Sequence, residues 1–539
     1  MIKNIIFMKN PHPLKLAISV LILAVILGVA LRIVGIIGKT TISHDEGISY
    51  MSATGHQGEY SRVRGGDYPF GAWVKASEWK RFIQIDKIFC FGQISYDLAH
   101  HDIHPPMYFW LLHLWSLMVG IQLWTGPSLN ILFVLIAAVF LFRFARYVLD
   151  DHLEAALVVF IWMISPAVLS ISLEARQYDL LALLAIIFMY QIIKSADLTK
   201  RFKLPEFILL MISTAAGALT HYSFLFIVTG CCGFLLIKLI REDRNRLIKS
   251  FVSIGFGYII SIFLNPGFYL AFVNQHADAQ PFRYAEIAPR IATISVSFLS
   301  FFFFPFRWMM YKYICAILLV ALIFIFFNIH RKERPGIMAY FRKEDFKIHY
   351  IFFLFIWLVG SQIIAYLAFI LPSHAVGERY YCMIWPAFAC VVVFLLRLFG
   401  KLRLIFTILL CFGLFMAGSS KMLYTKCTNR SLEAILRNSR YFLIDNVARG
   451  VFPMFFWHLP DDKIVYAANQ DHLLDKSERW LNRIDDNTFY FSSILYGNTK
   501  EKQGKILVLI KREHGVSSVE AEFLRISDAY LYRTGKKIK

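Results

Sequence analysis

Charged residues are scarce in this chain of 539 residues. Only 17% of the residues are Asp, Glu, Lys or Arg, whereas 58% are hydrophobic, and the mean hydropathy is +0.55. Soluble globular proteins carry about a quarter charged residues. The scarcity of charge therefore excludes an ordinary soluble enzyme and predicts a protein that crosses a membrane many times.

Acidic residues are fewer than basic residues. There are 37 Asp and Glu against 57 Lys and Arg, which gives a formal net charge of +20. A basic balance can indicate a nucleic-acid partner, but here Lys and Arg gather in short loops between apolar runs. This distribution is the positive-inside pattern of membrane proteins. We therefore expect a lipid bilayer, and no nucleic acid, as the partner of the basic residues.

Several signals of small structural modules are missing. The sequence has no CxxC pair, no zinc-type spacing, no internal repeat and no low-complexity segment. Of its eight cysteines, only Cys90 and Cys427 lie outside apolar runs. These two could pair, but they do not make a disulfide framework. No small-residue cleavage site follows the first apolar run, which we therefore interpret as a retained first span rather than a signal peptide.

Apolar runs long enough to cross a bilayer are the main feature of the first 425 residues. About eleven such spans are predicted, at residues 14–37, 127–147, 153–172, 178–194, 204–220, 222–240, 248–272, 311–329, 349–371, 380–398 and 403–422. Two shorter runs, 105–120 and 291–306, suit helices that lie in the membrane interface on the outer side. With the N-terminus in the cytoplasm, this assignment places the basic loops inside.

The fold class predicted from these runs is a polytopic α-helical membrane protein with a small C-terminal α/β domain. Residues 1–425 form the membrane domain, in which residues 38–126 are a first outer loop with interfacial helices. Residues 426–539 have an ordinary soluble composition and are expected outside the cytoplasm. Strands are predicted there at 463–468, 487–491 and 505–511. Helices are predicted at 475–482 and 517–525.

The predicted topology brings five polar segments, distant in sequence, to the outer face of the membrane. They are TISHDEGISY from Thr41, HDIHPP from His101, SLEARQYD from Ser172, THYS from Thr220 and HAVGERYY from His374. Chance explains one or two such coincidences, but five favour a shared site. Carboxylates at a membrane surface are costly unless they are paired or used. Asp45 and Glu46, directly after the first span, are therefore the first candidates.

A sugar transferase explains these residues well. On the outer face a sugar donor must be carried by a lipid, and polyprenyl phosphate is the usual carrier. The reaction needs a carboxylate that takes the proton of an acceptor hydroxyl, which Asp45 or Glu46 supplies. It also needs donors that hold the phosphate while negative charge develops on it. Arg176 and Arg379, at helix ends, have the guanidinium geometry that suits phosphate.

Other interpretations of the same residues remain open. Asp45 and Glu46 could be a solvated acidic pair at a helix end. Each arginine could anchor the chain in the interface or pair with its acidic neighbour, Glu174 or Glu378. His104 precedes an interfacial helix that Pro105 and Pro106 can start, which suits anion binding, but it could also occupy a solvated turn.

Metal binding is a further alternative for the histidine-rich segment. His100, His101 and His104 with Asp102 could bind a divalent metal, but no second group of ligands follows at metal spacing. We therefore expect no metal and no required cofactor. His221 and Tyr222 lie in a short outer turn, where a histidine either contacts the phosphate or acceptor or packs in the interface.

The segments HDEGISY, DIHPPMYFWLLHLW, SLEARQYDLLALL, THYSFLF and ERYYCMIWP, taken in this order, resemble the GT-C membrane glycosyltransferases. The resemblance is nearest to the branch with protein O-mannosyltransferases and the lipid A aminoarabinose transferase, and it covers residues 15–420. It implies a GT-C fold, a polyprenyl-phosphate-linked donor and inverting transfer outside the cytoplasmic membrane. At the positions of His104 and Ile103 the aminoarabinose transferase has Lys and Glu, which argues against that sugar and against a metal carried over from it.

These observations lead to one principal hypothesis. The protein is a glycosyltransferase of the cytoplasmic membrane, with a glycolipid, polysaccharide or protein as its hydroxyl acceptor. Asp45 is the catalytic base and Glu46 orients the acceptor or donor. The residues expected to hold the donor phosphate are His104, Arg176 and Arg379. The residues expected to line the substrate cavity are Asp102, Tyr178, His221, Tyr222, Glu378 and Tyr380.

Two other classes of protein would explain the spans. A lipid or sugar flippase should have repeated halves and charges at mid-membrane within broken helices. The sequence has no such repeat, and its charges gather at one face. A non-catalytic scaffold that presents the C-terminal domain would not need Asp45.

Overall fold

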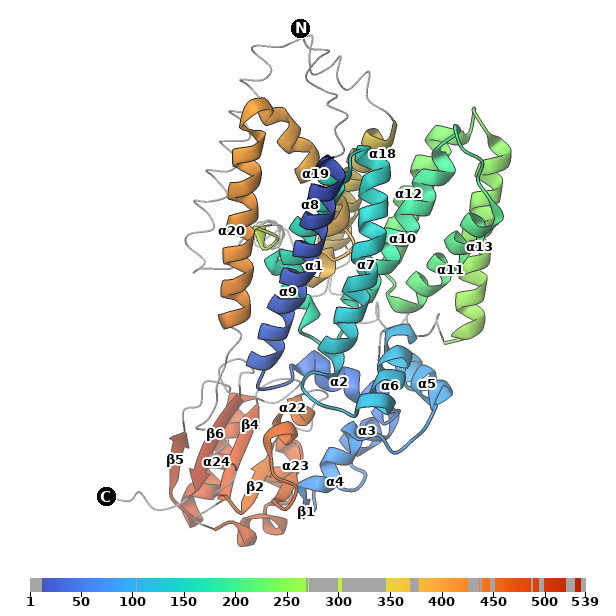
Figure 1. The fold of residues 1–539 in the computed structure, drawn as a ribbon. Helices are drawn as coiled ribbons and strands as arrows, with labels where there is room; N and C mark the ends of the chain where they lie inside the picture. The colour runs from blue at the N-terminus through green and yellow to red at the C-terminus, as the bar shows by residue number, and fades with distance from the viewer. Residues whose placement is uncertain are drawn as a thin grey trace. The chain divides into compact units, whose positions relative to one another are not determined.

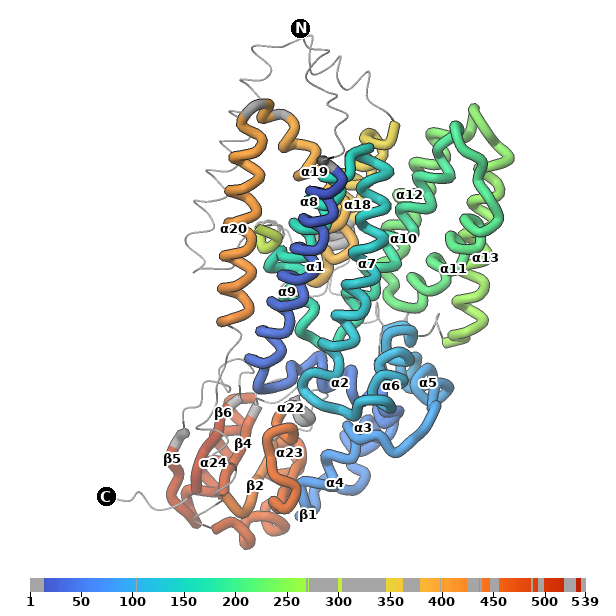
Figure 2. The backbone as a smooth tube through the Cα atoms, in the orientation of Figure 1, coloured from blue at the N-terminus to red at the C-terminus, as the bar shows by residue number. Residues whose placement is uncertain are grey.

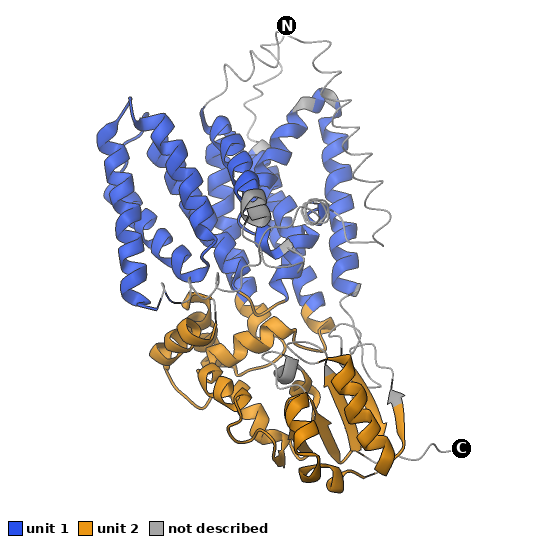
Figure 3. Ribbon diagram, turned by 180° about the vertical axis from the view of Figure 1, so that it is seen from behind, with its two compact units in different colours: residues 1–35, 130–173, 177–423 blue, residues 36–129, 174–176, 424–539 orange. Residues whose placement is uncertain are grey.

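The computed structural model describes residues 12–102, 104–267, 270, 299–302, 346–368, 378–424, 436, 439–445, 451–485, 488–493, 499–519 and 529–534. The chain divides into two compact units, coloured separately in Figure 3. Unit 1 comprises residues 1–35, 130–173 and 177–423, and unit 2 comprises residues 36–129, 174–176 and 424–539. The C-terminal part of unit 2 begins at Tyr424, close to the predicted boundary at 426. Its grouping with the first outer loop was not predicted.

The described secondary-structure elements of unit 1 are all helices, joined by turns and loops (Figure 1). Its helices are α1 (His12–Gly38), α7 (Thr125–Leu149), α8 (His152–Ile164), α9 (Pro166–Ser172), α10 (Tyr178–Ala196), α11 (Leu204–Thr220), α12 (Phe224–Leu239), α13 (Arg244–Leu264), α18 (Phe346–Ala368), α19 (Trp385–Leu396) and α20 (Arg403–Tyr424). Short 3₁₀ turns precede and follow α19, at Glu378–Tyr381 and Arg397–Leu402. The first residues of α7 and the last of α1 belong to unit 2.

These helices coincide with the predicted apolar runs. Each run from 14 to 272 and from 349 to 422 overlaps one of them, except the run at 153–172, which overlaps both α8 and α9. The run at 311–329 lies outside the described residues. By length and composition, five described helices can cross a membrane: α1, α7, α10, α13 and α20. The bent pair of α8 and α9 makes a sixth. The apolar parts of α11, α12, α18 and α19 are shorter. The polytopic helical fold is confirmed.

The bend between α8 and α9 has a local cause in the sequence. The two helices meet at 57° (Figure 2). Pro166 begins α9, and a residue that precedes proline is pushed out of the helical region, as the ψ of 131° at Ser165 illustrates. The break leaves the Met163 carbonyl available, and the buried Arg32 of α1 donates to it at 3.0 Å. The same guanidinium donates to Gly28 O and Ser172 Oγ, so the first span is tied to the broken one.

The first outer loop forms a set of short helices in unit 2. They are α2 (His44–Ala53), α3 (Gln57–Arg64), α4 (Ala76–Lys80), α5 (Phe91–His101) and α6 (Met107–Val119), with a 3₁₀ turn at Arg81–Ile83. With 13 residues, α6 is too short to cross a bilayer. Its length agrees with the interfacial helix predicted at 105–120. The second interfacial run, 291–306, is described only at 299–302.

The C-terminal part of unit 2 contains a mixed six-stranded sheet. Its strands are β2 (Tyr441–Ile444), β3 (Ile464–Ala467), β4 (Thr488–Ser493), β5 (Val516–Val519) and β6 (Ala529–Thr534), joined by β1 (Trp73–Lys75) from the first outer loop. The strand order is β1-β3-β2-β4-β6-β5. The three central strands run parallel, and β1, β6 and β5 are antiparallel to their neighbours. The sheet is thus completed at one edge by a strand that precedes most of the membrane helices in sequence.

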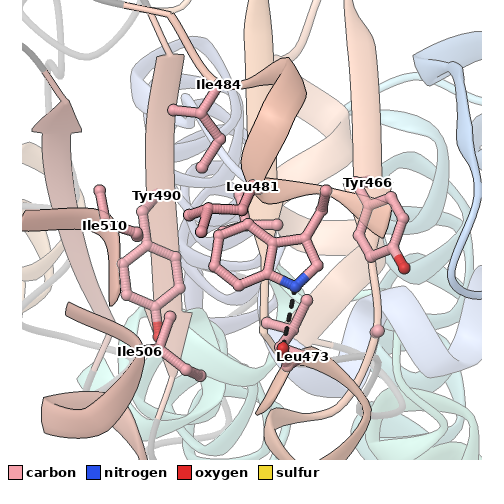
Figure 4. Packing of buried hydrophobic residues seen from close by; sticks show 10 residues of the cluster. Tyr466, Leu473, Leu481, Ile484, Tyr490, Ile506 and Ile510 are labelled. Carbon is pink, nitrogen blue, oxygen red and sulfur yellow. Dashed lines mark hydrogen bonds between the residues drawn. The ribbon is translucent and has the colours of Figure 1, made fainter. Parts of the chain in front are cut away.

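Alternation along the strands gives the sheet two apolar faces. Leu443, Tyr466 and Tyr490 pack with Ile506 and Ile510 of α24 (Lys500–Glu513). Figure 4 shows this cluster, in which the Trp480 indole donates to Leu473 O at 2.9 Å. On the other face Phe442 and Phe491 contact Phe455 of α22 (Val451–His458). Helices therefore cover both faces of the parallel centre, as parallel sheets require.

Three secondary-structure predictions in this part differ from the structure. Residues 505–511 belong to α24, not to a strand, because Gln503, Ile506 and Ile510 point to the core at helical spacing while Val508 is exposed. Residues 516–519 form strand β5, so the start of the helix predicted at 517–525 is wrong, and residues 520–525 lie outside the described residues. The predicted helix at 475–482 is a series of short turns after α23 (Gln470–Asp475). The predicted strands at 463–468 and 487–491 are confirmed as β3 and β4.

Candidate active site

Asp45 and Glu46 lie in the first turn of α2, directly after the first span. Ser43 caps the helix: its Oγ accepts from Glu46 N at 3.3 Å, and Glu46 Oε2 accepts from Ser43 N at 2.8 Å. This reciprocal pair is the capping box of a Ser-x-x-Glu sequence. The Asp45 side chain is 25% exposed, whereas the Glu46 side chain is 2% exposed. Of the two carboxylates, Asp45 is therefore the one that a substrate can reach.

Glu46 is fixed by contacts within the protein. Besides the cap, its Oε1 forms an ion pair with Lys39 Nζ and accepts from Ala175 N at 2.9 Å. The pair is almost fully buried, which makes it sensitive to the loss of either partner. Glu46 thus joins α2 to the end of the first span and to residues 174–176.

Arg176 makes two hydrogen bonds to α2 and a third contact with His104. Its Nη1 donates to Asp45 O at 3.3 Å and to Ser49 Oγ at 3.1 Å. Its Nη2 lies 3.0 Å from His104 Nε2. Arg176 is 3% exposed. The structure therefore brings the predicted base, the predicted phosphate-binding arginine and the predicted histidine into one site in unit 2.

His104 follows the end of α5 and precedes Pro105 and Pro106. Its Nδ1 lies 2.6 Å from Asp102 Oδ1. Because arginine only donates, His104 Nε2 must accept from Arg176, and Nδ1 must then carry the proton and donate to Asp102. Asp102, predicted to line the cavity, is thus a contact of His104.

Gln57 and two serines of α2 belong to the same network, and sequence reasoning missed them. Gln57 Nε2 donates to Asp102 Oδ2 at 2.8 Å, and Gln57 Oε1 contacts Ser52 Oγ. A closed ring of polar contacts therefore runs from α2 through Gln57, Asp102, His104 and Arg176 back to Ser49 of α2. A signal was present, because positions 45, 49 and 52 fall on one face of a helix.

Tyr50 of α2 links this helix to the start of α7 and to α22. Its hydroxyl accepts from Gly126 N at 3.1 Å and donates to Gln122 O at 3.4 Å. Burial and then the Glu46 carboxylate raise the pKa of this hydroxyl, so it stays protonated and able to donate. Its ring stacks on Trp457 of α22, with centroids 6.3 Å apart. The C-terminal part of unit 2 therefore contacts the helix that carries Asp45.

The remaining predicted site residues lie in unit 1. The Arg379 guanidinium lies 6.0 Å from the ring centre of Tyr178 and 5.3 Å from that of Tyr380. These distances are typical of cation–π contacts. The rings of Tyr178 and His221 are 6.3 Å apart. Contacts among their side chains make a second group of Arg379, Tyr178, Tyr380 and His221.

His221, Tyr222 and Glu378 lie in two short turns of unit 1. His221 Nδ1 accepts from Ser223 N at 3.1 Å at the start of α12. Tyr222 lies in the same turn and is half-buried. Glu378 begins the 3₁₀ turn that carries Arg379, and its side chain lies outside the described residues.

Metal ligands do not gather around His104. Among the described residues, no three His, Cys, Asp or Glu side chains come together in a group that could hold a metal ion. The possible disulfide involves Cys427, which lies outside the described residues.

Comparison with known proteins identifies the architecture. The structure of ArnT from Cupriavidus metallidurans bound to undecaprenyl phosphate matches with a TM-score of 0.53 and 10% sequence identity, over 95% of this chain and 97% of ArnT. The chain has the GT-C fold. The archaeal oligosaccharyltransferase AglB from Archaeoglobus fulgidus, in complex with an inhibitory peptide and a dolichol-phosphate, matches with a TM-score of 0.47 and 11% identity, over 92% of this chain and 71% of AglB.

Sequence comparison adds a local match within the GT-C fold. Residues 103–266 match the family described as dolichyl-phosphate-mannose-protein mannosyltransferase. The match begins next to His104 and includes Arg176 and His221. No curated protein matches the sequence.

Proposed function

We propose that this protein is a glycosyltransferase that moves a sugar from a polyprenyl-phosphate carrier to an acceptor hydroxyl. The observation that carries the proposal is the position of Arg176, which contacts both the turn of α2 that bears Asp45 and the imidazole of His104. A reachable carboxylate and two groups suited to phosphate are thereby held together. The GT-C fold and the local match to mannosyltransferases support it.

The proposed reaction uses Asp45 as the general base. Its carboxylate takes the proton of the acceptor hydroxyl while the acceptor oxygen attacks the anomeric carbon of the sugar. The bond from that carbon to the phosphate oxygen breaks, and the electron pair stays on the phosphate. Attack opposite to the leaving phosphate inverts the anomeric configuration.

Arg176 and His104 are proposed to hold the donor phosphate. A guanidinium presents several N–H groups in one plane, which suits a phosphate that gains charge as the sugar leaves. In this proposal Glu46 acts indirectly: through Lys39 and Ala175 it sets where Asp45 and Arg176 lie. The roles of Arg379, Tyr178, Tyr380, Glu378, His221 and Tyr222 stay predictions.

The proposed location is the cytoplasmic membrane, with the site on its outer face. The distribution of Lys and Arg among the loops supports this orientation. The acceptor is proposed to be an envelope glycolipid, a polysaccharide or a protein, since the described residues contain no group that selects among them.

Transfer assays with Asp45→Asn test the proposal. Purified protein is mixed with envelope extract and a polyprenyl-phosphate donor bearing a radiolabelled sugar, and labelled products are identified by mass spectrometry. Loss of the base should lower turnover by about 10²–10⁴-fold. Asp67→Asn, at an exposed position of the same unit, is the matched control and should behave as wild type. Normal transfer by the Asp45 variant, or no transfer of any supplied sugar by the wild type, would refute the proposal.

A further inference from the structure

His104 lies between one group that accepts and one group that donates. Its Nδ1 is 2.6 Å from Asp102 Oδ1, and its Nε2 is 3.0 Å from Arg176 Nη2. Since arginine cannot accept a hydrogen bond, the imidazole has its proton on Nδ1 and a lone pair on Nε2. In this arrangement the ring is neutral.

The Asp102 carboxylate is positioned to stabilise a positive charge on the His104 imidazole. Its side chain is 3% exposed, and its second oxygen accepts from Gln57 Nε2 at 2.8 Å. Gln57 is itself 1% exposed and also donates to His101 O at 3.2 Å. The carboxylate is thus fixed on the imidazole, where it would stabilise a second proton on the ring.

Other charged side chains near His104 belong to the segment that carries Arg176, to α2 and to the end of α5. Arg176 is the cation in contact with it, and α2 contributes Asp45 and Glu46, of which Glu46 is paired with Lys39. The end of α5 contributes His101 beside Asp102. Of these two contacts of His104, the one with Arg176 opposes a proton on Nε2 and the one with Asp102 favours it.

A phosphate bound to Arg176 would reverse this balance. Its oxygens would attract the Nη2 donor away from His104 Nε2. A proton on Nε2 would then lie between the Asp102 carboxylate and an anionic phosphate. Because such a proton is stabilised from both sides, phosphate binding and protonation of His104 should be coupled.

We propose that binding of the phosphate donor is coupled to uptake of one proton by His104, and that this proton passes to the phosphate during sugar transfer. The proposal rests on the proposed function. As the bond between the sugar and the phosphate oxygen breaks, its electron pair stays on the phosphate and the Nε2–H bond breaks. The proton goes to a phosphate oxygen, and His104 returns to the neutral form bonded to Asp102. The acceptor proton remains on Asp45 until it leaves to water.

Such a transfer suits the acidity of the leaving group. The dianion of a phosphate monoester, which is the form that leaves the sugar, binds a proton with a pKa near 6, close to that of an ordinary imidazole. A proton moves readily between groups of similar acidity, and a general acid of this kind contributes about 10²–10⁴-fold to the rate. His104 would thus be a catalytic residue in addition to a phosphate ligand.

Calorimetry can measure the proton directly. The probe is the methyl diester of undecaprenyl phosphate, which has no group that titrates near neutral pH. Binding to the full-length protein in nanodiscs is measured at pH 7.5 in two buffers of different ionisation enthalpy. The wild type should take up close to one proton. His104→Lys carries a fixed cation and should bind within a few-fold of wild type with no uptake, whereas Asp45→Asn should keep the uptake.

The outcomes separate this inference from the proposed function. Binding by the wild type without proton uptake would overturn the inference alone, as would uptake that persists in His104→Lys. No binding of the diester to any variant would overturn both. In transfer assays His104→Lys should lose at least about 10-fold in kcat with little change in KM for the donor, and an unchanged kcat would rule out the general acid.

Discussion

Gly126 packs so closely against Ala175 that a Cβ atom added at Gly126 would lie 2.2 Å from the Ala175 Cβ. Real Cβ atoms do not approach so closely, so the chain must move if the glycine is replaced. Ala175 also donates its N–H to Glu46, and Arg176 follows it directly. The glycine thereby fixes the distance between the start of α7 and the segment that carries Arg176.

Gly126→Ala should therefore impair transfer without touching any reacting group. A shift of about 1 Å in a catalytic group can lower the rate by about 100-fold. We expect turnover to fall by about 10–100-fold while the protein still folds and inserts. Gly92→Ala is the matched control, because nothing lies within 4 Å of the added Cβ there. Equal activity of the two variants would show that residues 174–176 tolerate the displacement.

The buried pair of Lys39 and Glu46 should be important for stability. Glu46→Gln removes the Glu46 carboxylate from the Lys39 ammonium, which is 8% exposed. Breaking a buried ion pair from one side costs about 3–5 kcal/mol. Thermal unfolding in detergent should reveal this loss, and Lys39→Met combined with Glu46→Gln should recover part of it. The exposed pair of Arg62 and Asp67 is the control, and Asp67→Asn should change stability by less than about 0.5 kcal/mol.

His56 should make the stability of unit 2 depend on pH. It is 2% exposed and contacts Asp86 at 3.1 Å. Burial, and then Lys87, lower the pKa of His56 even though Asp86 opposes the shift. The unfolded chain therefore binds a proton more readily, and the folded state loses stability as the pH falls below about 6.5.

His56→Gln removes the imidazole that takes up the proton, so this variant should lose less stability than the wild type when the pH is lowered. The measurement is the difference in Tm between pH 7.5 and pH 5.5 for both proteins. The variant should have the smaller difference, although its Tm at pH 7.5 is expected to be lower. Parallel decreases in the two proteins would show that other groups cause the acid sensitivity.

Arg32 should stabilise the broken span in unit 1. Its guanidinium binds Met163 O, which the bend at Pro166 leaves available, and Ser172 Oγ, and it is attracted by the Asp179 carboxylate. Arg32→Met removes these contacts and leaves Asp179 buried without its countercharge. A loss of about 3–5 kcal/mol is expected from such a break.

Asp179→Asn added to Arg32→Met tests the cause of that loss. The second change removes the uncompensated charge, so the double variant should be more stable than Arg32→Met alone. Ile33→Met, at a half-exposed position of the same helix, is the control and should be nearly neutral. If the double variant is no more stable than the single one, the loss comes from the carbonyl contacts rather than from charge.

The sequence predicted much of the fold, because long apolar runs predict membrane helices almost without tertiary information. The site was predicted in part. Asp45, Arg176 and His104 were chosen as candidates by their residue types and predicted outer position, and the structure places them together, whereas their roles stay predictions. Gln57 was missed because its role depends on Asp102, to which only folding brings it.

Errors were concentrated where local pattern and tertiary context disagree. The apolar residues of 505–511 resemble a strand, yet Thr499 caps a helix there, with its Oγ1 accepting from Lys502 N at 3.2 Å. Strand β1 has only three residues and no signal of its own. Its pairing with β3 is non-local and cannot be derived from either segment alone.

Strand β1 is synthesised long before β3, the strand with which it pairs. The ribosome produces Trp73–Lys75 before the helices from α5 to α20, and it produces β3 only after them. Until then Val74 has no strand to pair with. Once β3 has been made, its edge stays open to other chains until β1 pairs with it. Pairing of β1 with β3 can therefore form only after all the described helices from α5 to α20 have been synthesised, and a chain truncated before β3 should expose the unpaired segment to quality-control proteases.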